Sequence, residues 1–460
     1  MSSFLYEAFI KNIKNNPQKK IIHSLSENLS GKECLDRIAK TTNYLKENKI
    51  KRIALNSVNS IEWILWYISA KKICNQVFIF NQNTSDLQIK KIAKKYKIDL
   101  IIKDNKKIKI LHEHTKFYGQ KRADILYTSG TTKEPRGVIL EEKTYLHVVY
   151  VLLKKFKHTQ SDLELLSMPF SHSFGLTRLR CNLIAGSSFL VTDGLNNFPS
   201  IYNFSRSRKI TGLSLVPSGV ELIRYMLKNN TRNFIENLKF FEIGSSFLNN
   251  ESRVWLKKKF KKTLIYHHYG MTEASRSFMI GRGYLDKIYF KKNYIGKPIQ
   301  GCKIMLNNLN KQNIGELLIK GKNLFSGYIN EEDNKDRLIK GWYKTGDMCK
   351  KYKDKIEIIG RVDNQINIGG NKIHAEIIEA KIEKIPNILR SLCIPVKDTF
   401  FGNKISLIIE KEKKSNANII KKNILRIFKK GPSFLIPKDI IFKMIKLTAN
   451  GKKLRHINVI

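Results

Sequence analysis

Residues Ile125–Val138 read I-L-Y-T-S-G-T-T-K-E-P-R-G-V, and the rest of the chain is organised around this stretch. An apolar run is followed by five consecutive residues that are all Thr, Ser or Gly. Pro135 and Gly137 come shortly after them and mark the end of the loop. The pattern predicts a strand followed by a loop of free backbone N–H groups and hydroxyls, which can surround phosphate oxygens with donors. The alternative without a ligand is a Ser/Thr-rich surface turn. No Lys-Ser or Lys-Thr pair ends the loop, so it is not the G-x-x-x-x-G-K-[ST] phosphate loop.

Helical and strand patterns alternate on both sides of this stretch. Such alternation predicts a largely parallel α/β sheet, with ligands at the carboxyl ends of its strands. Short strands with glycines at 295–329 indicate a small β subdomain. Helices are expected at 34–47, 61–72, 87–96, 219–228, 376–385 and 419–430, and strands at 52–56, 77–80, 100–102, 163–168, 187–191, 212–216, 240–243, 263–267 and 405–410.

The composition is that of a folded protein with an unusual charge. Hydrophobic residues make up 42% of 460 residues, enough for a large core and two or three domains. Lys and Arg number 85 against 39 Asp and Glu, which gives a net charge of +46. The cations are spread from Lys11 to Lys453, which favours a compositional bias over a nucleic-acid surface. We expect no specific nucleic-acid partner, although the field would attract anions such as ATP, CoA or an acidic carrier protein.

Cysteine usage and hydropathy bear on the compartment. The six cysteines form no C-x-x-C pair, so neither a disulfide framework nor a zinc site is expected. Residues 1–14 read as an amphipathic helix and make a poor signal peptide. The most apolar stretch, 61–70, contains Glu62 and is too short to span a bilayer. A cytoplasmic protein without a transmembrane segment is the expectation.

A second motif, Y-G-M-T-E-A-S, occupies 269–275 after a predicted strand. Tyr269 offers an aromatic face for adenine, Thr272 a hydroxyl for the α-phosphate, and Glu273 a carboxylate for Mg²⁺. Mg²⁺ binds through one or two carboxylates together with phosphate oxygens, so one glutamate suffices. The alternative is a helix-start cap built from Thr272 and Glu273.

Together with three later segments, these motifs resemble those of the adenylate-forming (AMP-binding) enzymes, which include acyl-CoA synthetases, luciferases and peptide-synthetase adenylation domains. The first loop is similar to Y-T-S-G-T-T-G-x-P-K-G, with Lys133 in place of the usual Gly and Arg136 in place of the usual Lys. The later segments are Y-K-T-G-D at 343–347, G-R-V-D at 360–363 and T-A-N-G-K-K-L-R at 448–455. The resemblance runs from about residue 4 to residue 455 and is closest to acyl-CoA synthetases and acyl-acyl carrier protein ligases.

The resemblance implies an α/β fold in two domains. Residues 1–361 would form a large domain of α/β sheet subdomains plus a small β-barrel-like subdomain, binding ATP and the carboxylate. Residues 362–460 would form a small mobile α+β domain that carries the catalytic lysine. Asp363 would be the hinge, and Gly369 and Gly370 would line the entrance for the thiol.

The resemblance also assigns candidate site residues. Lys452, Thr131 and Glu273 would be catalytic, and Glu273 would hold Mg²⁺. ATP or AMP would be bound by Thr128, Ser129, Gly130, Thr132, Gly244, Ser245, Ser246, Tyr269, Gly270, Thr272, Asp347 and Arg361. The segment 244–246 matches its family turn only loosely, and it could equally be a loop that caps a helix through Asn249.

Residues 169–175 resemble the P-x-x-H-x-x-G segment of acyl and aryl CoA ligases, in which the histidine borders the carboxylate tunnel. His172 and Gly175 are therefore candidates for substrate binding, although His172 could instead structure a strand-to-helix turn. The aspartate that peptide-synthetase domains use for α-amino acids is absent, which favours an acid without an α-amino group. Arg178 and Arg180 could bind an anionic substrate group or face solvent, and we expect solvent.

The implied activity is that of an AMP-forming acid–thiol ligase. A carboxylic acid would be activated as acyl-AMP with release of pyrophosphate, and the acyl group would pass to a thiol, with CoA the expected acceptor. One alternative is a stand-alone adenylation enzyme that loads the phosphopantetheine of a carrier protein. Another is a catalytically inactive ATP-binding relative.

Overall fold

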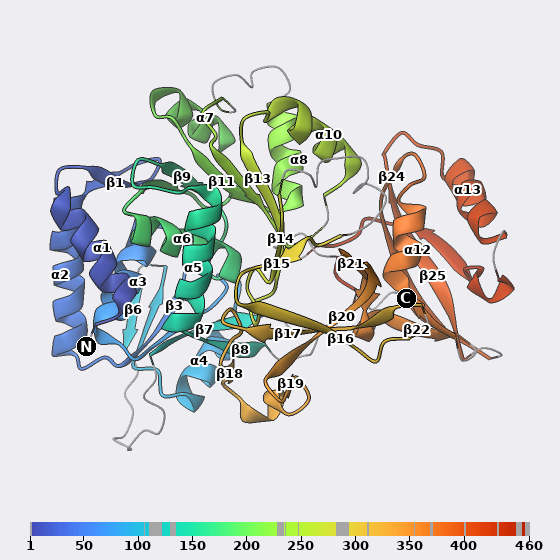
Figure 1. The fold of residues 1–460 in the computed structure, drawn as a ribbon, viewed down its shortest axis with the longest axis horizontal. Coiled ribbons are helices and arrows are strands. Elements are labelled where there is room, and N and C mark those ends of the chain that lie inside the picture. Colours follow the sequence, from blue (N-terminus) through green and yellow to red (C-terminus); the bar gives the residue numbers. More distant parts are fainter. Residues whose placement is uncertain are drawn as a thin grey trace. The chain divides into compact units, whose positions relative to one another are not determined.

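The computed structural model comprises two compact units (Figure 1). The first contains Met1–Phe290, Gly296–Lys303 and Ile319–Tyr343, and the second Lys291–Ile295, Ile304–Leu318 and Lys344–Ile460. The two units do not follow the expected division into domains 1–361 and 362–460, so that division stays a prediction. The residues described are 2–104, 106–109, 122–128, 135–227, 234, 236–246, 248–281, 294–310, 312–353, 355–368, 371–399, 402–429, 432–447 and 453–455.

A seven-stranded sheet in the first unit carries the Ile125 stretch. Its order is β18-β8-β7-β4-β3-β5-β6, with parallel pairing from β7 through β4 and β3 to β5. The strands β3, β4, β5 and β7 are buried along nearly their whole length, as strands covered on both faces should be. The bounds are β3 (Arg52–Asn56), β4 (Gln76–Ile79), β5 (Leu100–Lys103), β6 (Lys106–Lys109), β7 (Ala123–Thr128), β8 (Arg136–Glu141) and β18 (Gly327–Tyr328), with helices α2 (Gly31–Glu47), α3 (Ile61–Ile73) and α4 (Asp86–Lys95).

A nine-stranded sheet forms the rest of the first unit's framework, in the order β15-β14-β13-β12-β11-β9-β10-β1-β2. The strands from β13 to β1 are parallel, and the outer strands are antiparallel. The strands are β1 (Lys20–His23), β2 (Asn28–Ser30), β9 (Leu163–Leu166), β10 (Ser188–Val191), β11 (Gly212–Leu215), β12 (Phe240–Ile243), β13 (Leu264–Tyr269), β14 (Phe278–Ile280) and β15 (Lys297–Pro298). The helices are α1 (Phe4–Asn15), α5 (Glu142–Phe156), α6 (Ser173–Ala185), α7 (Phe198–Ser207), α8 (Pro217–Met226) and α10 (Asn250–Lys259).

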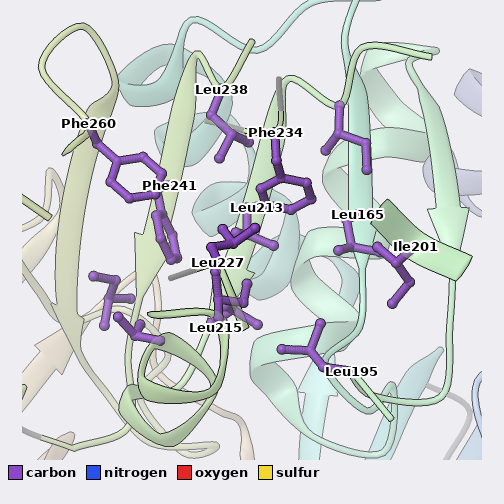
Figure 2. Close-up of a cluster of buried hydrophobic side chains, with 14 of the residues drawn as sticks. Leu165, Leu195, Ile201, Leu213, Leu215, Leu227, Phe234, Leu238, Phe241 and Phe260 are labelled. Atoms are coloured by element: carbon purple, nitrogen blue, oxygen red, sulfur yellow. The ribbon is translucent and has the colours of Figure 1, made fainter. Parts of the chain in front are cut away.

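The main core of this sheet is a cluster of buried leucine, isoleucine and phenylalanine side chains. Figure 2 shows Leu165, Leu213 and Phe241 from three neighbouring strands together with Leu227 and Phe234. Each large apolar side chain buried in this way contributes about 1.5–3 kcal/mol. The cluster therefore fixes the carboxyl ends of β9, β11, β12 and β13, where the candidate motifs begin.

Local signals set several helix ends. The side chain of Ser30 accepts from the backbone of Glu33, and the Glu33 side chain reaches back, which makes a capping box at the start of α2. Pro217 stands in the first turn of α8, where its missing N–H costs nothing. Asn249 caps α10 by accepting from Ser252 N at 2.8 Å, which is the helix cap given as the alternative for this loop.

The smaller sheets lie mainly in the second unit. A five-stranded sheet has the order β16-β17-β20-β19 with β21 beside β20; β16, β17 and β20 contribute residues to both units, and β19 belongs to the first. A hairpin β22–β23 and a sheet β24-β25-β26 pack with α12 and α13 around an isoleucine-rich core. The bounds are β16 (Cys302–Asn307), β17 (Ile314–Gly321), β19 (Leu338–Ile339), β20 (Trp342–Tyr352), β21 (Lys355–Arg361), β22 (Gln365–Ile368), β23 (Asn371–His374), α12 (Ala375–Ile382), β24 (Ile388–Asp398), β25 (Gly402–Lys411), α13 (Ala417–Lys429) and β26 (Asp439–Phe442).

The predicted α/β class with a smaller β subdomain and a terminal α+β region is confirmed. Over the described part of the chain, no helix is both long enough and apolar enough to cross a membrane.

Candidate functional site

The strands β7 and β8 frame the predicted phosphate loop. They pair antiparallel up to Thr128 and Arg136, so the chain leaves and re-enters the sheet at one point. The Thr128 hydroxyl lies 3.5 Å from the carbonyl oxygen of Arg136, too long for a strong hydrogen bond. Ser129, Gly130, Thr131, Thr132 and Lys133 lie outside the described residues.

Arg136, which stands at the family's lysine position, is engaged by the protein itself. Its Nε lies 3.0 Å from Oδ1 of Asp333, and its guanidinium lies 5.7 Å from the centre of the Tyr328 ring. A planar guanidinium can pair and stack at once, which an ammonium group cannot do in the same way. Arg136 is therefore held at the start of β8, beside Tyr328.

The Tyr269–Glu273 segment forms a closed turn at the end of β13. Met271 and Ala274 exchange backbone hydrogen bonds, each 3.2 Å long. A side chain on Gly270 would place its Cβ 2.4 Å from the backbone N of Arg276, so this turn requires glycine. Thr272 and Glu273 at its tip are half-buried, within reach of a ligand.

Glu273 is held by a tyrosine that lies outside the predicted motifs. The Tyr328 hydroxyl donates to Oε1 of Glu273 at 2.8 Å and lies 3.3 Å from the Tyr343 hydroxyl. Burial, with the neighbouring Glu273 carboxylate, raises the pKa of Tyr328, so the hydroxyl keeps its proton. Within the described ranges Glu273 has no cationic partner, and no cluster of three or more His, Cys, Asp and Glu side chains could hold a metal ion.

His172 and Gly175 stand at the start of α6, directly after β9. His172 is the N-cap residue, and its Nε2 lies 3.4 Å from Nδ2 of Asn81. A Cβ on Gly175 would lie 2.4 Å from the carbonyl oxygens of both Met168 and Pro169. The glycine therefore allows the first turn of α6 to pack on the Met168–Pro169 backbone that follows β9.

The Gly244–Ser246 loop follows β12 and packs on two buried histidines. A Cβ on Gly244 would lie 2.1 Å from the His268 ring, and Ser245 has φ +83°, an uncommon value for a residue other than glycine. Nε2 of His267 lies 2.9 Å from the carbonyl oxygen of Ser246 and donates to it. Burial, with the charges of His268 and Arg253, lowers the pKa of His267 to about 3, so the ring is neutral at pH 7.

Arg276 brings three of the candidate segments together. Its guanidinium donates to the carbonyl oxygens of Ser173 and Phe174, both at 2.9 Å, and to Oε1 of Glu242 at 3.1 Å. The same carboxylate oxygen lies 2.8 Å from Nδ1 of His268. Although burial alone would raise the pKa of Glu242, Arg276 and His268 hold it below its usual range. The sequence signal for this centre was a single glutamate inside the apolar strand F-F-E-I and an arginine just after the second motif.

The expectation that Arg178 and Arg180 face solvent is wrong, because both are almost completely buried. Arg178 makes two 2.7 Å hydrogen bonds to the Glu164 carboxylate. Arg180 pairs with Asp124 and donates to the Tyr67 hydroxyl. Two buried guanidinium groups with internal carboxylate partners are structural ion pairs, so neither is available to an anionic substrate.

In the second unit, Asp347 and Arg361 form a cross-strand pair. Nη1 of Arg361 donates to Oδ1 of Asp347 at 2.9 Å, and Nη2 donates to Oδ2 of the exposed Asp363 at 3.2 Å. Gly346, with φ +75°, donates its N–H to Glu316 and turns the strand before Asp347. Gly369 and Gly370 lie outside the described residues.

Lys452 also lies outside the described residues, but the chain beside it is anchored. Leu447 and Lys453 form an isolated antiparallel bridge. Lys453 and Arg455 both bind the buried Glu379 of α12, with Arg455 making contacts of 2.7 and 2.9 Å to its two oxygens.

Comparisons with known proteins agree with these motifs. The family model described as AMP-binding enzyme matches residues 120–329. The chain is 27% identical over 346 residues to bacitracin synthase 3 of Bacillus licheniformis and 28% identical over 346 residues to a probable CoA ligase, CCL9, of Humulus lupulus. Each match covers 72% of this chain, but it spans only 5% of the synthase and 64% of the ligase.

A solved structure shares the fold. O-succinylbenzoate CoA synthetase (MenE) of Bacillus subtilis, in complex with ATP and a magnesium ion, superposes with a TM-score of 0.81 at 18% identity. The superposition covers 97% of this chain and 98% of that one. The family match over residues 120–329, these relatives and the shared fold confirm the predicted resemblance to the AMP-binding, adenylate-forming enzymes.

Proposed function

We propose that the protein is an ATP-dependent acid–thiol ligase that uses CoA as its acceptor. A carboxylate oxygen of the substrate attacks the α-phosphorus of ATP, and the bond to the bridging oxygen of pyrophosphate breaks. The thiol then attacks the acyl carbon of the acyl-AMP, and AMP leaves as the thioester forms. The match to the AMP-binding enzyme family supports the first step, and the CoA ligase relative supports the choice of thiol.

One observation carries the proposal. Three segments that the sequence predicted for acid, adenine and magnesium are separated by up to about 100 residues, yet Arg276, Glu242 and His268 connect them in one unit. A surface turn or a helix cap would need no such connection. Positioning of the two substrates is what this reaction chiefly requires of a protein.

The residues fit Mg²⁺ and the nucleotide phosphates. Glu273 offers a half-buried carboxylate whose protein partner is a neutral hydroxyl, which suits a hard cation. Mg²⁺ bound there would neutralise charge on the phosphates. The hydroxyls of Thr128, Thr131 and Thr272 and the backbone of Ser129, Gly130 and Thr132 would donate to phosphate oxygens, while Gly244–Ser246, Tyr269 and Gly270 would border adenine.

The second unit supplies the remaining proposed groups. Asp347 would accept from the ribose hydroxyls, and Arg361 would donate to the ribose or a phosphate. Lys452 would approach the carboxylate and α-phosphate during the first step. Asp363 would be the hinge that lets the small domain, 362–460, rotate, and Gly369 and Gly370 would then line the path of the thiol.

Pyrophosphate exchange tests this function. Purified protein with Mg²⁺ should exchange labelled pyrophosphate into ATP only when a suitable acid from a panel is present. Lys452→Ala should abolish exchange while ATP binding remains measurable by calorimetry. Lys443→Ala, which removes an exposed lysine nine positions earlier, is the matched control and should exchange normally. Undiminished exchange by Lys452→Ala would exclude its assigned role, and no exchange with any acid would favour an inactive relative.

The acceptor needs a separate measurement, because the match to a peptide synthase favours a carrier protein as the second candidate. Thioester formation should be compared with CoA and with a phosphopantetheinylated acidic carrier at equal concentration. Faster transfer to CoA supports the proposal. Transfer to the carrier alone would replace it with carrier loading.

A further inference from the structure

Arg276 is a buried cation in a strained backbone position. Its side chain is 1% exposed, and its φ of +49° is in the left-handed region. Such a conformation costs a non-glycine residue about 1–3 kcal/mol and persists only where the surroundings fix it. Here the backbone of Arg276 closes the base of the turn, lying against Gly270.

The guanidinium uses its planar geometry fully. Nη1 and Nη2 donate to the carbonyl oxygens of Ser173 and Phe174, the two residues between His172 and Gly175; Gly175 in turn packs on the backbone of Met168 and Pro169. Nε donates to Glu242, and the ring of Phe174 lies 5.0 Å from the guanidinium carbon. A lysine ammonium could keep the charge but could not reach both carbonyls and the carboxylate in this fork.

These contacts connect two parts of the proposed site. Residues 172–175 carry the candidate acid-binding histidine, and residues 269–273 carry the candidate ligands for adenine and Mg²⁺. Asn323 fixes the same turn from the other side by donating to Ser275 O at 3.2 Å and to the Ser277 hydroxyl at 3.0 Å. The turn is therefore rigid, and Arg276 transmits its position to the start of α6.

We propose that Arg276 is a positioning residue that holds the His172–Gly175 segment against the Tyr269–Glu273 turn, so that the acid and MgATP bind cooperatively. The inference rests on the proposed function. It adds that the carboxylate site is correctly placed only while the turn is closed. Arg276 need not touch either substrate for this effect.

The test is a kinetic and coupling comparison on the full chain. In pyrophosphate exchange with the acid found in the panel, Arg276→Lys should raise the KM for the acid about tenfold or more, as expected for lost buried charge-assisted hydrogen bonds. The affinity for MgATP in the absence of the acid, measured by calorimetry, should change by less than about twofold, because the turn itself stays intact; with the acid present, both affinities should fall, since coupling is reciprocal. A double-mutant cycle combines His172→Ala with Glu273→Gln. Their effects on kcat/KM in exchange should be non-additive in the parent and close to additive in the Arg276→Lys background.

Arg180→Lys is the matched control, because it alters an equally buried guanidinium whose partners are Asp124 and Tyr67. It should lower stability without raising the KM for the acid and without removing the coupling between the two sites. If Arg276→Lys instead behaves like Arg180→Lys, or the coupling persists, the inference is overturned while the proposed function stands. If the parent shows no exchange, the proposed function fails and the inference falls with it. Should Arg276→Lys not fold, Arg276→Gln is judged by the same criteria.

Discussion

Arg361 donates from Nη1 to Oδ1 of Asp347 at 2.9 Å, from strand β21 to the residue directly opposite on β20. Arg361 Nε is buried and has no hydrogen-bond partner among the residues that the structure describes. An unsatisfied buried donor costs about 1–3 kcal/mol, so a bound acceptor would relieve a penalty. The two residues proposed for the ribose thus form one preassembled acceptor–donor pair.

Asp347→Asn should weaken ATP binding about ten- to hundredfold, because hydrogen bonds to charged groups contribute about 1.5–3 kcal/mol. Calorimetric titration with MgATP measures the change. Glu410→Gln is the matched control, since Glu410 also pairs across strands with an arginine, Arg390, at 3.0 Å. Affinity equal to that of the parent would remove Asp347 from the ribose site.

Glu273→Gln should raise the Mg²⁺ concentration for half-maximal exchange by at least about tenfold. Substituting even a residue that only hydrogen-bonds to a metal ligand typically lowers metal affinity by that factor. The amide keeps the shape and can still accept from Tyr328, but it lacks the charge that Mg²⁺ prefers. Tyr328→Phe, which removes only the hydrogen bond, should have a smaller effect. A Mg²⁺ titration that Glu273→Gln leaves unchanged would assign the metal elsewhere.

The order of strands and helices could be predicted because apolar spacing reports local structure. The strands at 52–56 and 240–243 match to the residue, and the alternation predicted the parallel sheets. The strand β24 was not predicted, since Pro395 interrupts its pattern; the sheet accommodates the proline because β24 is an edge strand.

The buried charges were the part that sequence could not reveal. Arg178 and Arg180 were expected to face solvent, whereas their partners Glu164 and Asp124 lie 14 and 56 residues away. Arg276 was not singled out by the sequence, and its counter-ion Glu242 lies 34 residues away. A charge in a sequence shows its sign but not its counter-ion. The motifs themselves were found because the residues proposed to touch a substrate lie within short, contiguous turns.

Arg178→Met should lower the free energy of unfolding by about 3–5 kcal/mol, the usual cost of leaving a buried charge without its partner. The stranded group is the Glu164 carboxylate, which is fully buried. Urea denaturation measures the loss. The control Arg224→Met breaks a half-exposed pair with Glu221 and should cost less than about 1 kcal/mol. Adding Glu164→Gln to Arg178→Met should recover part of the stability, because it removes the stranded charge. An equal loss of stability in Arg178→Met and Arg224→Met would contradict this account.

Gly175→Ala should cost about 1–3 kcal/mol and impair exchange, because the new methyl group would meet two backbone carbonyl oxygens at 2.4 Å. Backbone cannot rotate away, so the first turn of α6 must shift and take His172 with it. Gly219→Ala in α8 is the control, since its nearest neighbour is a flexible Leu215 methyl at 3.2 Å. That change should be neutral or slightly stabilising. Normal activity and stability in Gly175→Ala would show that the turn tolerates a Cβ.

His267 should make the protein lose stability on mild acidification. Its pKa is about 3 in the folded protein, against an ordinary value of 6.5. Above pH 6.5 the ring is neutral in both states, so its contribution is complete. Between pH 6.5 and 3 the unfolded chain takes up a proton that the folded chain refuses, and the free energy of unfolding falls by about 1.4 kcal/mol per pH unit. Urea denaturation from pH 7 to pH 4 should therefore show a steeper decline in the free energy of unfolding for the parent than for His267→Asn.

His158 provides an independent repeat, because burial and the charge of Arg178 also lower its pKa to about 3. The variant His158→Asn should flatten the same decline. Parallel stability curves for parent and variants would mean that these rings accept protons without unfolding.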